Sequence, residues 1–70
     1  MEQTNPTVKL RKLTGLNKYR FAAQTEISRG TLDNLEAGKL ASGETWRAIS
    51  ARWGEELRTL RLVAEDFVGG

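Results

Sequence analysis

Two short stretches in the first half of the chain carry hydrophobic residues at helical spacing and meet at a corner. The positions on one face of each predicted helix are Phe21, Ala22 and Thr25 in the first stretch, and Leu32 and Leu35 in the second. Ser28 favours the start of the second helix because its hydroxyl accepts a hydrogen bond from a free backbone N–H. Ile27 lies between the two helices as an apolar plug, and Ala22 is small enough to let them pass closely. The pattern therefore predicts two helices that cross in a tight corner.

Residues that start or stop helices extend this pattern to both sides of the corner. Asn5 followed by Pro6 is typical of a helix start, and Gly15 can adopt the left-handed conformation that ends a helix. Caps and apolar spacing together predict five helices, over residues 6–14, 18–25, 29–37, 44–53 and 55–68. No stretch shows the alternation of a strand. The sequence therefore predicts an all-α, five-helix orthogonal bundle that forms a single domain of residues 1–70.

The same periodicity predicts which side chains form the core. The expected inward residues are Leu10 and Leu13 in the first helix, Trp46, Ile49 and Trp53 in the fourth, and Leu57, Leu60, Val63, Ala64, Phe67 and Val68 in the fifth. Leu62 falls on the polar side of the fifth helix. Two interpretations stay open for it: an exposed leucine without a role, or a contact between two copies of the chain in which Leu57 and Phe67 also take part.

Composition excludes several kinds of function. A chain of 70 residues is near the lower limit for a self-sufficient core, and it contains no cysteine and no histidine. Disulfides, thiolate metal sites, the usual zinc ligands and the commonest general base are therefore missing. We expect no enzymatic activity, no cofactor, no metal and no small-molecule substrate. Without a membrane-spanning run or a signal-peptide pattern, we also expect a soluble, cytoplasmic protein.

Charge is distributed unevenly along the chain. The net charge is +2, which is weak evidence for a nucleic-acid partner. Residues 1–40 hold seven basic and four acidic residues, whereas residues 41–70 hold four basic and five acidic ones. The basic half is therefore the half that contains the corner, as a phosphate-facing surface requires. An ordinary solvated surface is the alternative interpretation.

The second helix of the corner carries polar side chains opposite its leucines. Those expected to face outward are Arg29, Gly30, Thr31, Asp33 and Asn34. Arginine can bind guanine through two hydrogen bonds, asparagine can bind adenine in the same way, and threonine can contact the methyl group of thymine. A carboxylate on this face is repelled by phosphates unless it accepts a bond from cytosine, so the role of Asp33 stays open.

The order of these motifs resembles the helix-turn-helix of the phage repressor/Cro family. The resemblance covers about residues 10–54, and the segments that carry it are KYRFAAQTEISRGTLDNLEA at residues 18–37, Gly15-Leu16-Asn17 before it, and Glu36-Ala37-Gly38-Lys39 and Glu44-Thr45-Trp46-Arg47-Ala48-Ile49 after it. It implies a lambda-repressor-like DNA-binding domain. Such a domain would bind a double-stranded DNA operator, with residues 29–37 in the major groove and two copies on a two-fold site.

The resemblance also implies roles for individual residues. The base-reading residues would be Ser28, Arg29, Gly30, Thr31 and Asn34, the phosphate-binding residues Lys18 and Lys39, and the structural ion pair Arg11 with Glu36. A solvated side chain or a phosphate contact is the alternative for Arg29, and a helix cap is the alternative for Ser28. Gly30 either allows close approach to the bases or is simply tolerated in a first turn.

The chain departs from the family pattern at two places. Glu26 occupies the turn position that usually holds glycine, where the backbone often needs a positive φ. Two alternatives stay open: the turn is built differently, or a residue other than glycine there costs about 1–2 kcal/mol of stability. Trp46 and Trp53 stand where aliphatic residues are usual, and we expect both to pack in the core.

Three functions are compatible with these features. The leading interpretation is a small transcriptional regulator of phage or prophage origin, a repressor or Cro-like protein that binds its operator as a homodimer. The antitoxin of a toxin–antitoxin pair would use the same domain with a protein partner. A protein-interaction module that has lost DNA binding, such as an anti-repressor, is favoured slightly by Glu26, Asp33 and the modest net charge.

Overall fold

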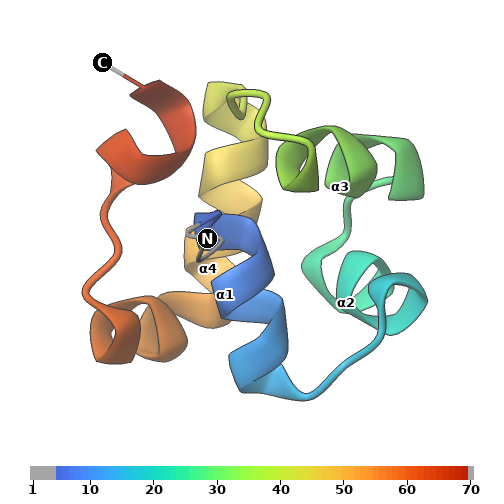
Figure 1. The fold of residues 1–70 in the computed structure, drawn as a ribbon, viewed down its shortest axis with the longest axis horizontal. Helices are drawn as coiled ribbons and strands as arrows, with labels where there is room; N and C mark the ends of the chain where they lie inside the picture. Colours follow the sequence, from blue (N-terminus) through green and yellow to red (C-terminus); the bar gives the residue numbers. More distant parts are fainter. Residues whose placement is uncertain (1–4, 70) are drawn as a thin grey trace.

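Side-chain caps fix where the first four helices of the protein begin. In a computed structural model that describes residues 5–69, the helices are α1 (Pro6–Thr14), α2 (Lys18–Thr25), α3 (Arg29–Glu36), α4 (Gly43–Leu60) and the π-helix η1 (Glu65–Gly69) (Figure 1). The side-chain oxygens of Asn5, Asn17, Ser28 and Ser42 accept bonds from backbone N–H groups of the first turns. The described residues form no strand, and the all-α prediction is confirmed. Among them, no helix is long and apolar enough to cross a membrane.

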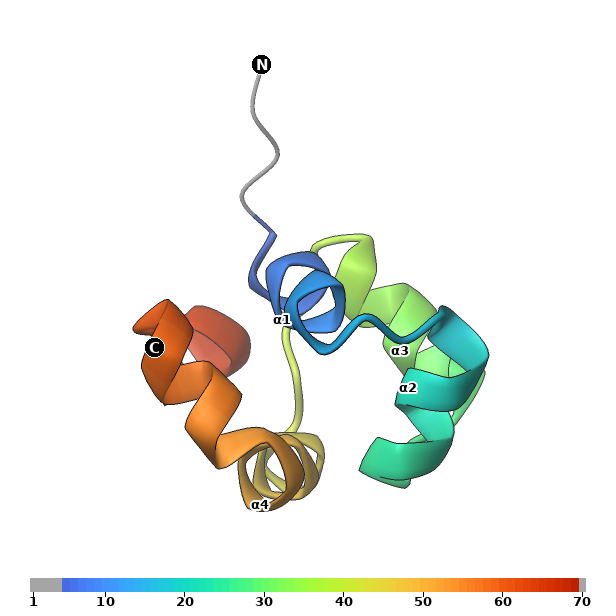
Figure 2. The same ribbon diagram turned by 90° about the horizontal axis from the view of Figure 1, so that it is seen from below.

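The helices surround one core. Figure 2 shows α1 and α4 on opposite sides of it, with the α2–α3 pair on the third side and η1 on the fourth. The side chains at the centre are fully buried: Leu10, Phe21, Leu32 and Ile49 each have 0% exposure. Since these residues come from α1, α2, α3 and α4, the first four helices share one core.

α1 buries a different stripe from the predicted one. Leu10 is buried as expected, but Leu13 is 46% exposed and Thr7 is buried in its place. Residues 7, 10 and 14 share one face of the helix, and that face is turned toward the core. The prediction of an inward Leu13 was therefore wrong.

The predicted break at Gly54 is a kink and not a helix end. Trp53 has non-helical backbone angles, φ −116° and ψ 29°, but α4 continues beyond it to Leu60. The helix ends at Arg61, which adopts the left-handed conformation, and the N–H of Leu62 bonds the carbonyl of Leu57 at 2.9 Å. Such a left-handed cap satisfies the last carbonyls of the helix. Because a residue other than glycine occupies it, the sequence pattern did not predict it.

This early end changes the predicted fifth helix over residues 55–68. Only Glu65–Gly69 forms a further helix, so Val63, 55% exposed, and Ala64 do not join the core. Leu57 and Phe67 are buried in the core cluster, and Leu62 is partly buried and packs against that cluster. These three side chains therefore do not form an exposed contact surface for a second copy, and that prediction was wrong.

Both tryptophans pack against the core, as expected. The ring of Trp53 stacks on Phe21 with centroids 5.2 Å apart and an interplanar angle of 5°. Its indole Nε1 donates to Thr25 Oγ1 at 2.6 Å, and that hydroxyl donates to the carbonyl of Phe21 at 2.7 Å. Trp46 packs on Phe67 with centroids 5.1 Å apart. Trp53 thus joins α4 to α2, and Trp46 joins α4 to η1.

The turn between α2 and α3 uses a left-handed residue at Glu26, with φ 65° and ψ 39°. The N–H of Ile27 bonds the carbonyl of Ala22 at 3.0 Å, and the N–H of Glu26 bonds that of Ala23 at 3.2 Å. This is the hydrogen-bond pattern of a Schellman cap, in which glycine is favoured. Of the two alternatives, the structure therefore shows a turn that keeps the positive φ with glutamate in place of glycine.

We expect Glu26→Gly to raise the free energy of unfolding by about 1 kcal/mol, because glycine has no Cβ to strain in this conformation. Chemical denaturation of the two proteins measures the difference. Ala23→Gly is the control, since it introduces glycine at an exposed helical position and should destabilise by a similar amount. A less stable Glu26→Gly protein would contradict the strain at the turn.

Candidate nucleic-acid interface

The outer face of α3 holds most of the predicted base-reading residues. Ser28, Arg29, Gly30 and Asn34 are exposed, and Thr31 is half-buried. On the opposite face, Leu32 has 0% and Leu35 has 4% exposure. The two leucines therefore fix the rotation of the helix about its axis, and the polar residues face solvent together.

Arg29 and Asn34 have free side chains. Neither forms a side-chain hydrogen bond or an ion pair within residues 5–69, and both are exposed. They are separated by five residues, about 7.5 Å along the helix axis. Their donor groups are therefore available to a ligand that lies along α3.

Ser28 and Thr31 form the N-terminal cap of α3. Ser28 Oγ accepts from the N–H of Thr31 at 3.0 Å and donates to Thr31 Oγ1 at 2.8 Å. The Ser28 hydroxyl is thereby used within the protein, which favours its interpretation as a cap. The hydroxyl proton of Thr31 stays available for an external acceptor.

The predicted ion pair between Arg11 and Glu36 is present. Arg11 Nε lies 2.6 Å from Glu36 Oε2, and the two side chains are 21% and 9% exposed. Arg11 Nη2 also bonds Glu36 Oε1 at 3.4 Å, and Nη1 donates to the carbonyl of Leu16 at 3.4 Å. This pair joins α1 to the last residue of α3 and has a structural role.

Lys18, the predicted phosphate-binding residue at the start of α2, is held by carboxylates. Its Nζ lies 3.3 Å from Asp33 Oδ1 and 3.8 Å from Glu36 Oε1. Asp33, whose role the sequence left open, therefore pairs with a lysine from the preceding helix. Lys18 and Asp33 lie on different helices, so the spacing of residues along the sequence does not predict this contact. The arrangement of α2 against α3 brings the two side chains together.

Other cations surround this face without intramolecular partners. Arg20 and Lys39 are exposed and form no ion pair within the described part of the chain. Tyr19, beside Lys18 at the start of α2, is 68% exposed. Together with the free N–H groups of the first turn of α2, they can attract an anion.

Asn5 positions α3 in a way that the sequence pattern did not predict. Its Oδ1 caps α1, and its Nδ2 donates to the carbonyls of Leu35 and Glu36 at 3.0 and 3.3 Å. One amide thus satisfies the start of α1 and the end of α3. The interface helix is held at its C-terminal end by this bond and by the Arg11–Glu36 pair.

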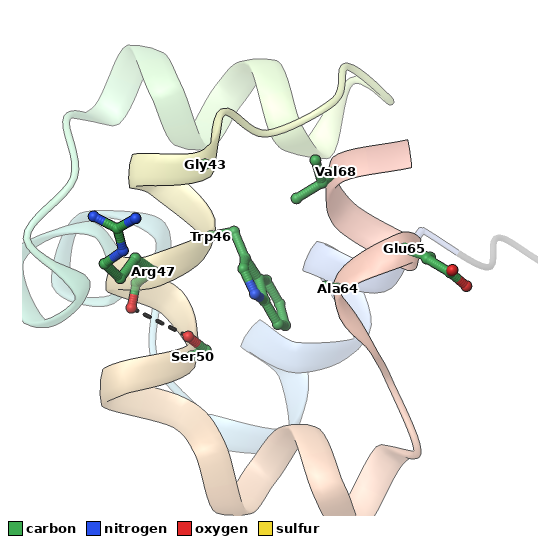
Figure 3. A pocket seen from close by; sticks show the side chains of 7 residues that line it. All are labelled: Gly43, Trp46, Arg47, Ser50, Ala64, Glu65 and Val68. Carbon is green, nitrogen blue, oxygen red and sulfur yellow. Dashed lines mark hydrogen bonds between the residues drawn. The ribbon is translucent and has the colours of Figure 1, made fainter. Parts of the chain in front are cut away.

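A separate groove of about 570 Å³ lies between α4 and η1. Figure 3 shows the ring of Trp46 between α4 and η1, with Arg47 on α4 and Glu65 on η1 pointing away from the ring on opposite sides. The residues that line the groove are Gly43, Trp46, Arg47, Ser50, Ala64, Glu65 and Val68. None of them belongs to α2 or α3, so the groove is distinct from the outer face of α3.

We expect Gly30→Ala to stabilise the protein. A Cβ at residue 30 would meet only Ser28 Oγ at 3.9 Å, an ordinary contact, and alanine is favoured over glycine in a helix by about 1 kcal/mol. The melting temperature should rise by roughly 4–8 °C. Gly38→Ala is the matched control, since its φ of 97° strains any side chain and its melting temperature should fall. A lower value for Gly30→Ala would mean that the protein's own packing requires this glycine.

Comparison of the chain with protein families, with curated proteins and with solved structures gave no match. No relative therefore assigns a role to the outer face of α3 or to the groove.

Proposed function

We propose that this protein is a sequence-specific regulator of transcription that binds double-stranded DNA through a lambda-repressor-like helix-turn-helix formed by α2 and α3. The observation that carries the proposal is the pair of free side chains, Arg29 and Asn34, on the exposed face of a helix whose other face is locked in the core. Both residue types can form paired hydrogen bonds with base edges in the major groove.

The proposed complex places α3 in the major groove, which is wide enough to admit a helix. Arg29 then binds O6 and N7 of a guanine, and Asn34 binds an adenine. Their separation of about 7.5 Å along the helix corresponds to about two base-pair steps of 3.4 Å. Thr31 lies between them and contacts a thymine methyl group or a phosphate.

Phosphate contacts fix the position of the protein on the duplex. Lys18, at the positive end of α2, and Lys39, after α3, are the proposed phosphate ligands. These contacts supply affinity and orientation but carry no sequence information. Occupation of an operator in this way would block RNA polymerase, as expected of a repressor or Cro-like protein.

The groove between α4 and η1 is the proposed interface of a homodimer. Arg47 and Glu65 lie on its two sides and form no ion pair within the described residues. In the proposed dimer Arg47 of one copy faces Glu65 of the other, and two-fold symmetry then forms this ion pair twice. The small residues Gly43, Ser50 and Ala64 allow close approach to the apolar wall formed by Trp46 and Val68.

This dimer has a direct test by charge reversal. We expect Arg47→Glu and Glu65→Arg each to weaken self-association by at least about tenfold, because like charges then face each other across the axis. The double variant restores opposite charges and should associate like the original protein. Sedimentation equilibrium measures the dissociation constants. A monomeric original protein, or a double variant as weak as the single ones, would exclude this interface.

DNA selection tests the proposed function itself. Selection from a randomised duplex pool, at low and at physiological salt, should enrich a two-fold site with half-site centres about 34 Å apart. With Arg29→Ala, specificity should be lost at one position in each half-site, at a cost of about 1–3 kcal/mol there. Arg58→Ala, which changes an exposed arginine on α4, serves as the control. Failure to enrich any sequence at either salt concentration would refute sequence-specific binding.

A protein-interaction module without DNA binding is the second candidate. The groove beside Trp46 and the acidic Asp33 on the outer face of α3 favour it. Salt distinguishes the two candidates, because binding through phosphate contacts weakens steeply as salt rises. Binding to a protein need not depend on salt in this way.

A further inference from the structure

The ion pair between Lys18 and Asp33 joins the start of α2 to the outer face of α3. Lys18 Nζ lies 3.3 Å from Asp33 Oδ1, and the side chains are 45% and 52% exposed. The second carboxylate near this ammonium, Glu36, lies at 3.8 Å and is itself bonded to Arg11. The cation at the N-terminus of α2 is therefore balanced by acidic groups in the free protein.

Asp33 contributes little to the fold. Its side chain is exposed, and within residues 5–69 the one hydrogen bond of its carboxylate is the bond to Lys18. Exposed ion pairs of this kind add little to folding stability because water screens them. Glu36 differs, since its side chain is 9% exposed and accepts two bonds from Arg11. The fold therefore does not require the carboxylate of Asp33.

We propose that Asp33 sets the specificity of DNA binding by competing with the DNA backbone for Lys18, an inference that rests on the proposed function. To contact a phosphate, Lys18 has to leave Asp33, and an unpaired carboxylate then remains close to the duplex. Non-specific binding consists almost entirely of phosphate contacts. On random DNA nothing replaces the bond between Asp33 and Lys18, so Lys18 stays with Asp33 and one phosphate contact is not made.

A specific site can compensate for the lost ion pair. Asp33 precedes Asn34 on the face proposed to read bases, and a carboxylate accepts a hydrogen bond from cytosine N4 in the major groove. A site with cytosine at the facing position replaces the bond to Lys18, whereas an arbitrary sequence does not. Asp33 thus lowers the affinity for other sequences more than it lowers the affinity for the specific site. Repulsive elements produce specificity in this way.

Asp33→Asn tests this competition, because it removes the charge and keeps the shape. Affinity is measured for the selected duplex and for a random-sequence duplex over a series of salt concentrations. On random DNA, one additional phosphate contact steepens the slope of log K against log salt by about 0.9, which is about eightfold tighter binding near 0.1 M salt. Binding to the selected site should gain less, so the ratio of the two affinities falls. Asp33→Ser, which also lacks the charge, should give the same changes.

Two control variants separate competition for Lys18 from a general effect of charge. In a Lys18→Met background, Asp33→Asn should no longer steepen the slope, because the competing cation is gone. Glu55→Gln removes one negative charge from an exposed position on α4 and should leave the slope unchanged. An equal gain in either control would overturn the proposed competition.

The outcomes distinguish this inference from the function on which it rests. If the original protein binds DNA and both Asp33 variants leave the slope and the affinity ratio unchanged, the role of Asp33 is refuted while DNA binding stands. If the original protein binds neither duplex at low salt, both the proposed function and the role of Asp33 are refuted.

Discussion

The stacked rings of Trp53 and Phe21 hold α2 and α4 in a fixed relation, and most of the structure depends on this contact. The ring planes differ by 5°, and the indole N–H is bonded to Thr25 at 2.6 Å, so both the position and the orientation of the indole are determined. The backbone of α4 leaves helical geometry at Trp53 itself. The contact thus holds α2 in place against α4. It lies at the kink after which the second half of α4 runs in a different direction.

The α3 helix is consequently held on several sides while one face stays free. Its leucines pack in the core, the turn at Glu26 joins it to α2, and Asn5 and Arg11 bind its C-terminal end. A rigid helix does not have to be ordered when a ligand binds, so less binding free energy is lost. Free polar side chains on a rigid helix are what a reader of base edges requires.

The basic and acidic side chains around α3 partly neutralise one another, so this surface is not strongly basic. Arg11 and Lys18 face Glu36 and Asp33 within one network, while Arg20, Arg29 and Lys39 remain unpaired in the described part of the chain. Non-specific DNA affinity grows with the number of available cations. If the proposed function holds, a surface with few free cations would depend on base contacts to a larger extent than on phosphate contacts.

The sequence by itself determined the features that depend on neighbouring residues. The starts of the first three helices and the buried leucines of α3 followed from caps and helical spacing, because a cap bonds only the first turn of its own helix. The resemblance supplied the Arg11–Glu36 pair, but it left open whether the turn at Glu26 keeps a positive φ. Tertiary structure decided the rest: Thr7 replaced Leu13 in the core, α4 continued past Gly54 to a cap at Arg61, and Lys18 met Asp33. Periodicity shows which faces a helix can bury, but packing between helices decides which of them is buried. The same packing decides where α4 ends and which charged side chains meet.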